Sequence, residues 1–153
     1  MYSIEKLDAH SEDVKHYIES SKEKEPRFME RYDSYMLEEE VATKLKCHSQ
    51  KYTIYAFSAE WCPDCMRNIP VLARIQEATG LKTRIFGHLM RDAKSSTKRW
   101  RIPPSPAEVE EFDLIKIPSM YILDKAGNKV GDIIEHPPTG MTLEAAVLKI
   151  LES

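Results

Sequence analysis

A long apolar run near the middle of the chain is followed at once by a helical pattern. Residues 52–59 are almost continuously apolar, β-branched or aromatic, which is typical of a buried strand. From Met66, apolar residues recur at helical spacing as far as Gly80, a residue type common just after a helix. We therefore expect a buried strand that leads directly into a helix.

Weaker patterns predict the remaining elements of the second half. Alternating apolar and polar residues, bounded by residues common in turns, predict further strands at residues 81–89, 117–124 and 129–135. A helix-start box at Ser105 predicts a short helix to about Phe112, and one apolar face predicts a last helix from about Thr142. Strand, helix and strand within about forty residues form a parallel βαβ unit. The order of elements predicts an α/β fold.

Residues 1–48 are acidic and predict helices ahead of a core in residues 50–153. Ser11 can cap a first helix, and Pro26 marks the start of a second one. The second helix carries an apolar and aromatic stripe of Phe28, Tyr32, Tyr35, Met36 and Ala42. We expect this stripe to pack on the sheet, and a partner-docking face is the alternative. No linker divides residues 1–153, so we expect one domain with a helical N-terminal extension.

Two cysteines lie where the central helix should begin, in the order Cys62, Pro63, Asp64 and Cys65. Pro63 suits the first helical position, where a missing N–H costs nothing. The first N–H groups of a helix lack intrahelical partners, and the helix dipole places partial positive charge on them. A thiolate at Cys62 can accept those groups, so we expect its pKa to lie below the free value of about 8.5. The motif therefore predicts a reversible dithiol.

A zinc site is an alternative interpretation of the cysteines. Cys47 and His48 precede the buried strand, and together with Cys62 and Cys65 they have the ligand types of a zinc site. No second Cys-x-x-Cys or His-x-His pair accompanies them, and Pro63 suits redox chemistry better. We therefore expect no metal, with Cys47 packed as a small apolar residue or left as an idle thiol.

Composition and charge limit the classes of partner. With 153 residues, 42% hydrophobic residues and a formal charge of −3, we expect a globular protein without a general attraction to nucleic acid or anionic membrane.

No apolar run approaches the roughly 18 residues of a membrane span. Residues 1–8 lack a secretory signal pattern, and three cysteines cannot all pair within the chain. We therefore expect a cytoplasmic location.

The segment 82–101 is locally basic, with seven Lys and Arg residues against the single acid Asp92. One interpretation is a contact for an acidic partner or a phosphate, with Trp100 stacked on a base. The other is a solvated insertion whose Trp100 folds back onto the core. No RNA-binding signature accompanies the segment, so nucleic acid is not an expected partner.

Residues 50–153 resemble the thioredoxin-like superfamily. The resemblance rests on the run from Ala59 through Trp61 to Cys65, on Pro70, and on Ile117-Pro118 ahead of a hairpin and a closing helix. Trp-Cys-Pro-Asp-Cys is similar in particular to thioredoxin-related proteins. The resemblance implies a thioredoxin-like fold, in which a central mixed sheet is flanked by helices, and it implies no cofactor.

The same resemblance implies roles for individual residues. Pro118 would be a cis proline that faces the disulfide, substrate backbone would dock along Ile117 and Pro118, and Trp61 would flank the exposed sulfur. Thioredoxins carry a buried acid where this chain has Ala56, and their usual first strand is not visible here. Asp64 either favours the helix dipole or relays the Cys65 proton.

We therefore expect a thiol–disulfide oxidoreductase. Cys62 would attack a disulfide of a protein or small substrate, and Cys65 would resolve the mixed disulfide. An external thiol reductant or reductase would then restore the dithiol, and a cytoplasmic setting favours the reducing direction. A thioredoxin-fold binding or redox-sensing module without general reductase activity is the alternative.

Overall fold

The centre of the protein is a mixed five-stranded sheet in the order β1-β3-β2-β4-β5. The computed structural model describes residues 1–87, 89 and 105–153. The strands are β1 (Glu12–Asp13), β2 (Tyr52–Phe57), β3 (Thr83–Phe86), β4 (Ser119–Asp124) and β5 (Lys129–Ile134). Strand β2 runs parallel to β3 and antiparallel to β4, and β4 runs antiparallel to β5. This mixed sheet confirms the expected α/β fold.

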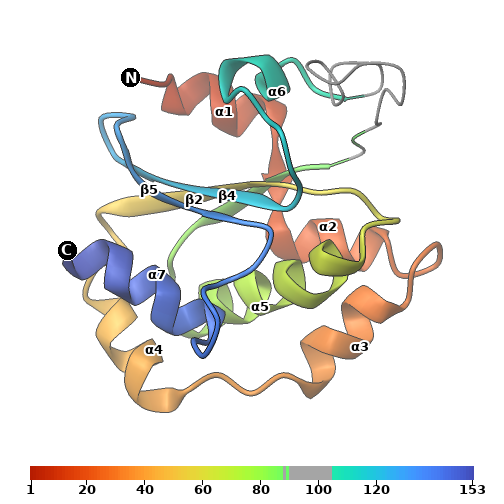
Figure 1. Ribbon diagram of the computed structural model, residues 1–153, viewed down its shortest axis with the longest axis horizontal. Coiled ribbons are helices and arrows are strands. Elements are labelled where there is room, and N and C mark those ends of the chain that lie inside the picture. Colours follow the sequence, from red (N-terminus) through yellow and green to blue (C-terminus); the bar gives the residue numbers. More distant parts are fainter. Residues whose placement is uncertain (88, 90–104) are drawn as a thin grey trace.

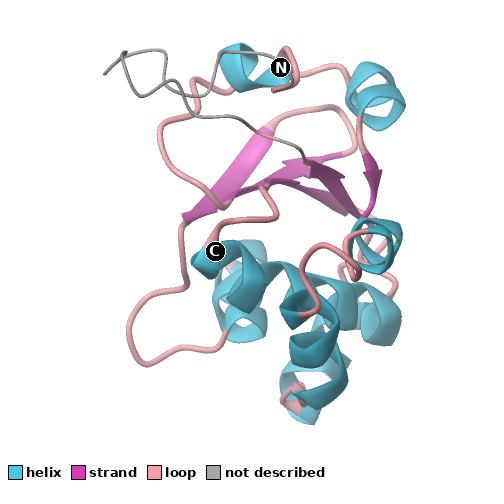
Figure 2. Cartoon of the chain, turned by 90° about the vertical axis from the view of Figure 1, so that its right-hand side faces the viewer, coloured by secondary structure: helices cyan, strands magenta, loops and turns pink. Residues whose placement is uncertain are grey.

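Helices cover both faces of the sheet, so the fold has three layers (Figures 1 and 2). The helices are α1 (Ile4–His10), α2 (Val14–Ser20), α3 (Arg27–Ser34), α4 (Glu39–Lys46), α5 (Pro63–Thr79), α6 (Glu108–Glu111) and α7 (Leu143–Glu152). Helices α1 and α6 lie over one face, and the other helices lie over the opposite face. Among the described residues, none of these helices is long and apolar enough to span a bilayer.

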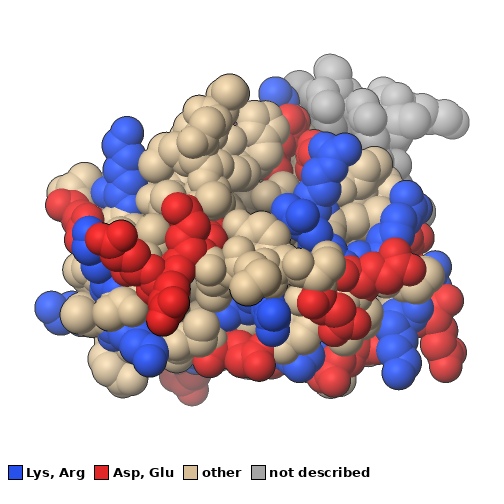
Figure 3. All heavy atoms as spheres, turned by 90° about the horizontal axis from the view of Figure 1, so that it is seen from below, with Lys and Arg blue, Asp and Glu red and all other residues tan. Residues whose placement is uncertain are grey.

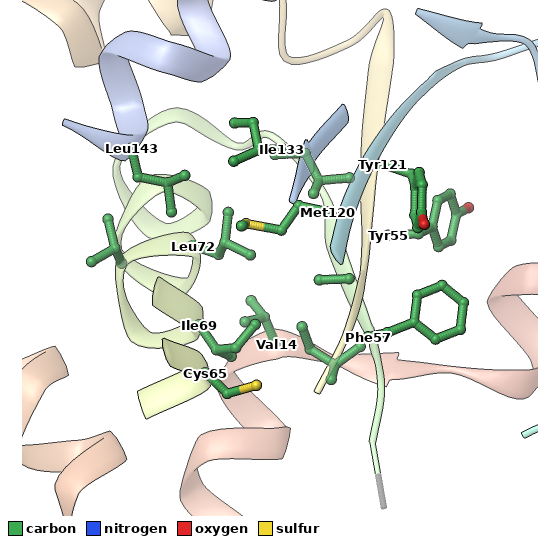
Figure 4. Packing of buried hydrophobic residues seen from close by; sticks show 14 of the residues in the cluster. Val14, Tyr55, Phe57, Cys65, Ile69, Leu72, Met120, Tyr121, Ile133 and Leu143 are labelled. Carbon is green, nitrogen blue, oxygen red and sulfur yellow. The ribbon is translucent and has the colours of Figure 1, made fainter. Parts of the chain in front are cut away.

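Strand β2 is buried, as its apolar run predicts, and the structure shows that both of its faces are covered. On the side of α1 and α6, the ring of Phe57 stacks on Phe86 with 4.9 Å between centroids, and Phe112 and Tyr121 lie edge-on to it. On the other side, Leu72 of α5 packs in the same buried cluster as Met120 (Figure 4). Two hydrophobic layers therefore hold β2 in the centre of the molecule.

The central helix α5 begins and ends where local chemistry predicts. Its first residue is Pro63, and Gly80 follows its last turn with a φ of 78°. This left-handed conformation suits glycine, and it lets the N–H of Gly80 donate to the carbonyl of Gln76 at 2.8 Å. The strand and helix that carry the cysteines are thereby confirmed.

The N-terminal extension differs from the expectation at two places. Helix α2 is capped by Asp13, whose Oδ2 accepts the N–H groups of Lys15 and His16, whereas Ser11 ends α1 and its hydroxyl donates to the carbonyl of Leu7. The expectation that Ser11 caps the helix was therefore wrong. The extension is also not purely helical, because β1 pairs antiparallel with the edge of β3. A strand of two residues is too short to show alternation in a sequence.

The aromatic stripe is divided between two helices. Helix α3 ends at Ser34, α4 begins at Glu39, and Met36 in the connection is 85% exposed. Phe28 and Tyr32 are buried, and α3 packs against α5. The stripe therefore covers a helix and not the sheet, and the expected single helix through Ala42 was wrong.

Two residues of the basic segment have structural partners. Lys82 Nζ lies 2.5 Å from Asp8 Oδ2, and Arg84 Nη2 donates to the carbonyl oxygen of Asp8 at 3.0 Å. Both basic side chains therefore hold α1 against the sheet. The rest of the expectation, including Trp100, lies outside the described residues.

Glu144 connects the N-terminal extension to the last helix. Its side chain is fully buried, and its oxygens accept hydrogen bonds from the Tyr35 hydroxyl at 2.7 Å and the Glu38 N–H at 2.9 Å. It also lies in the first turn of α7, where the helix dipole favours a carboxylate.

Glu144→Ala should lower the free energy of unfolding by about 3 kcal/mol, because it removes the charged acceptor of two part-buried hydrogen bonds. Denaturant unfolding measures this change. The exposed Glu152→Ala in the same helix is the matched control and should change stability little. Equal losses in both variants would show that the buried carboxylate does not hold the extension.

Candidate active site

Cys62 occupies the N-cap of α5, at the end of the turn that follows β2. Its backbone is extended, and its Sγ accepts the N–H of Cys65 at 3.2 Å. The backbone N–H of Cys62 donates to the carbonyl of Ala59 at 3.3 Å, which closes the turn. The sulfur thus takes the place that a serine or aspartate oxygen takes in an ordinary cap.

The environment of Cys62 favours the thiolate. A hydrogen bond donated by the Cys65 thiol is the largest cause that lowers the pKa of Cys62, and the backbone N–H groups of Cys65 and Asp64 act in the same direction. Burial and the negative charge of Asp64 oppose this effect. The net result is a pKa below that of an ordinary cysteine, as the motif predicts.

Cys65 lies one turn further along, beneath Cys62, and it is fully buried. Its side chain points from α5 toward the sheet, near Ile69 and Val14 (Figure 4). Burial raises the pKa of Cys65 well above that of a free thiol, and the neighbouring Cys62 adds to the rise. The two sulfurs therefore differ in character, because one favours the anion and the other favours the thiol.

The two residues between the cysteines lie at the surface of the first turn. Pro63 is exposed at the first helical position. Asp64 is half-buried, and its Oδ1 lies 3.3 Å from Arg67 Nη1. A carboxylate in this turn is favourable for the helix dipole, and its pairing with Arg67 directs it along the helix surface. This geometry favours the dipole role of Asp64 over a relay to Cys65.

Ile117 and Pro118 lie beside the cysteine motif. Their peptide bond is cis, as the resemblance implied. The carbonyl oxygen of Ile117 is 3.8 Å from Cys62 Sγ, and the carbonyl of Pro118 accepts the N–H of Glu135 at 2.6 Å. The segment before β4 is thereby held against the reactive sulfur.

The surface around Cys62 is largely closed. The Cys62 side chain is 5% exposed, whereas Trp61 next to it is 51% exposed. A molecule that reaches the sulfur would therefore contact the Trp61 side chain and the backbone near Ile117. All of the residues expected at the site thus come together, although they come from segments more than fifty residues apart.

The zinc interpretation finds no support in the arrangement of ligands. Cys47 caps the C-terminal end of α4 and is a free, exposed thiol, so of its two expected states the packed apolar residue is excluded and the idle thiol stays open. Within residues 1–87, 89 and 105–153, no three His, Cys, Asp or Glu side chains are grouped as metal ligands. Cys47 and His48 are therefore not brought together with the cysteine motif.

Sequence reasoning missed Ser58, which lies beneath the motif. It follows directly after β2, is fully buried, and its hydroxyl oxygen lies 2.9 Å from that of Tyr17. The sequence did offer one signal, because Ser58 is a polar residue within an apolar run and a buried hydroxyl requires a hydrogen-bond partner. The local sequence does not show which residue that partner is.

Solved structures share this fold across nearly the whole chain. A protein of unknown function from Pseudomonas aeruginosa and an HIV epitope scaffold each match with a TM-score of 0.68 and 22% identity, covering 99% of this chain and 98% of their own. StoA from Bacillus subtilis matches with a TM-score of 0.35 and 17% identity, over 66% of this chain and 82% of its own, and this likeness carries no argument. No curated protein matches the chain significantly.

A family model also matches most of the chain. The family model described as thioredoxin matches residues 11–148, from just before α2 into the first part of α7. The chain therefore belongs to the thioredoxin family.

Proposed function

We propose that this protein is a thiol–disulfide oxidoreductase that reduces disulfides through Cys62 and Cys65. The single observation that carries the proposal is the N-cap position of Cys62, where its sulfur accepts the N–H of Cys65 at 3.2 Å above a buried second thiol. A structural cysteine pair has no need of sulfurs with opposite proton preferences, whereas an exchange reaction uses both.

In the first step, the Cys62 thiolate attacks one sulfur of a substrate disulfide. A bond forms between Cys62 and that sulfur, and the other substrate sulfur leaves as a thiolate and takes up a proton. The lowered pKa of Cys62 supports this role, because only the thiolate is nucleophilic. Substrate backbone would dock along Ile117 and Pro118, with Trp61 beside the reacting sulfur.

In the second step, Cys65 attacks Cys62 and releases the reduced substrate. A bond forms between the two cysteines, and the bond to the substrate breaks. The position of Cys65 one turn along α5 supports this role, because the backbone N–H of the same residue already lies 3.2 Å from Cys62 Sγ. Two electrons pass to the substrate, and an external thiol reductant or reductase would return the protein to the dithiol.

The substrates we propose are disulfides of proteins or of small molecules, in a cytoplasmic setting that favours reduction. Acidic and basic side chains are interspersed on the helical face of the molecule (Figure 3), in keeping with the formal charge of −3. Such a surface gives no strong electrostatic selection of one partner. Recognition would therefore depend on the surface around Trp61.

A redox-sensing or binding module is the second candidate. The 5% exposure of Cys62 favours it, because a nearly closed sulfur restricts attack on large folded substrates. A Cys65→Ser protein that traps disulfide-containing substrates as mixed disulfides would favour the oxidoreductase. Oxidation of the dithiol without any trapped substrate would favour the sensor.

Single cysteine variants should separate the two steps of exchange. Cys62→Ser should reduce the rate to background, because the attacking sulfur is lost. Cys65→Ser should retain the first step and accumulate the mixed disulfide, which intact-mass spectrometry detects. Cys47→Ser is the matched control, and it should react like the wild type because its sulfur lies outside the site. Native activity in Cys62→Ser would contradict the proposal.

Asp64→Asn should lower the pKa of Cys62 further. The carboxylate disfavours a nearby anion and so raises the pKa of the thiol, and its removal reverses this effect. The rate of Cys62 alkylation by iodoacetamide, measured against pH in a Cys47→Ser background, should therefore reach its midpoint at lower pH. The exposed Glu152→Gln controls for net charge. An unchanged or higher midpoint in Asp64→Asn would show that its charge does not act on Cys62.

A further inference from the structure

A buried amide links the helix that carries the cysteines to the segment after β5. Asn68 lies in α5, one turn after Cys65, and it is 7% exposed. Its Nδ2 atom donates to the backbone oxygen of Asp64 at 2.9 Å and to that of Glu135 at 3.0 Å. An amide nitrogen has two protons, so these two bonds use both of them. The second bond crosses 67 residues of sequence and joins two separate elements.

Glu135 takes part in this link through its backbone alone. It follows directly after β5, and its φ of 67° lies in the left-handed region that favours glycine. Its N–H donates to the carbonyl of Pro118 at 2.6 Å, and its own carbonyl accepts from Asn68. Its side chain is directed elsewhere, because Oε1 lies 3.7 Å from Lys116 Nζ. Hydrogen bonds to both backbone groups of Glu135 offset the cost of its conformation.

The link ends at the docking segment, Ile117 and Pro118, which the proposed function assigns to substrate backbone. Asn68 bonds to Glu135, and Glu135 bonds to Pro118, so the amide ties the docking segment to α5. The docking segment also lies against the reactive sulfur, because the Ile117 carbonyl is 3.8 Å from Cys62 Sγ. It therefore meets the first two turns of α5 through one sulfur and one amide.

Of these two contacts, the amide is the one that can persist during the reaction. As a thiol, Cys62 donates its proton to the Ile117 carbonyl, and a thiolate or a mixed disulfide has no proton to donate. The sulfur contact is consequently lost when Cys62 becomes reactive or bonds to substrate. The amide of Asn68 does not titrate and takes no part in the exchange, so both of its hydrogen bonds remain available in these states.

We propose that Asn68 is a positioning residue for substrate docking. Through the backbone of Glu135, it holds the docking segment on α5 while the Cys62 sulfur reacts. This inference rests on the proposed function and adds a residue of the second helical turn to it. Both bonds that the amide donates end on carbonyl oxygens, so it acts on the docking segment and not on the sulfur. Loss of the amide should weaken binding of extended substrates and leave the chemistry of Cys62 unchanged.

Two disulfides with the same leaving group separate docking from chemistry. The first is 5,5′-dithiobis(2-nitrobenzoate), which has no peptide backbone. The second is an extended peptide whose single cysteine forms a disulfide with 5-thio-2-nitrobenzoate. In both reactions the Cys62 thiolate bonds to one sulfur, and the other sulfur leaves as the coloured aromatic thiolate, which is the better leaving group of the peptide disulfide.

The reduced full chain is used, and all proteins carry Cys47→Ser, so that only the two site cysteines can react. The first release of coloured thiolate is followed against the concentration of each disulfide. For the peptide, this dependence gives a half-saturating concentration and a limiting rate. The limiting rate is also measured against pH.

Asn68→Ala should raise the half-saturating concentration of the peptide about three- to tenfold, because the hydrogen bond that ties the docking segment to α5 is lost. The limiting rate, its pH profile and the reaction with the small disulfide should stay as in the wild type. Asn68→Ser is a milder second variant. A serine hydroxyl in a helix bonds to the carbonyl four residues earlier, here Asp64, so Glu135 still loses its donor and the same rise is expected.

Gln76→Ala is the matched control. Gln76 lies near the opposite end of α5 from the cysteines, and its amide also joins the helix to other segments. Its Nε2 donates to Asp13 Oδ1 at 2.8 Å, and its Oε1 accepts the N–H of Thr83 at 2.7 Å. Its loss should lower the free energy of unfolding, measured in denaturant, without changing either disulfide reaction.

Several outcomes would overturn the inference while leaving the proposed function intact. These are a wild type that the peptide does not saturate, an unchanged half-saturating concentration in both Asn68 variants, and an equal rise in Gln76→Ala. A slower reaction of Asn68→Ala with the small disulfide would also overturn it, because the amide would then act on the sulfur. A wild type that releases no coloured thiolate from either disulfide would overturn the proposed function as well.

Discussion

The sulfur of Cys62 serves as the N-cap of α5, and the other features of the site depend on that position. A cap must be extended and must offer an acceptor to the first N–H groups of the helix. Cys62 meets both requirements, so the interaction that starts the central helix also stabilises the thiolate. The same turn places Cys65 one helical turn below, in the core. Folding of the strand and helix thus creates two sulfurs with different proton affinities.

The N-terminal extension is part of this arrangement. Helix α3 covers α5, Glu144 of α7 accepts hydrogen bonds from Tyr35 and Glu38, and Tyr17 of α2 reaches Ser58 under the cysteine motif. These contacts connect the extension to the strand and the helices that carry the two cysteines, so the extension contributes to the stability of the site.

Local chemistry was sufficient to predict the centre of the fold from sequence. The apolar strand, the Pro63 start and the Gly80 stop each follow from a rule that acts over a few residues. The cap at Asp13 was missed because Ser11 is an equally good cap two residues earlier. The position of Ile117 came only from resemblance, and the Tyr17–Ser58 pair could not be predicted, because a contact across 41 residues leaves no local pattern.

The most direct test of the account is a redox titration of the dithiol. The protein is equilibrated with defined thiol–disulfide ratios, and free thiols are counted in the wild type and in Cys47→Ser. The account predicts one two-electron couple in both proteins, with a tenfold change in the ratio of oxidised to reduced protein for about 30 mV. A redox couple that is present in the wild type but absent in Cys47→Ser, or no redox couple in either protein, would contradict the claim that Cys62 and Cys65 form a working redox pair.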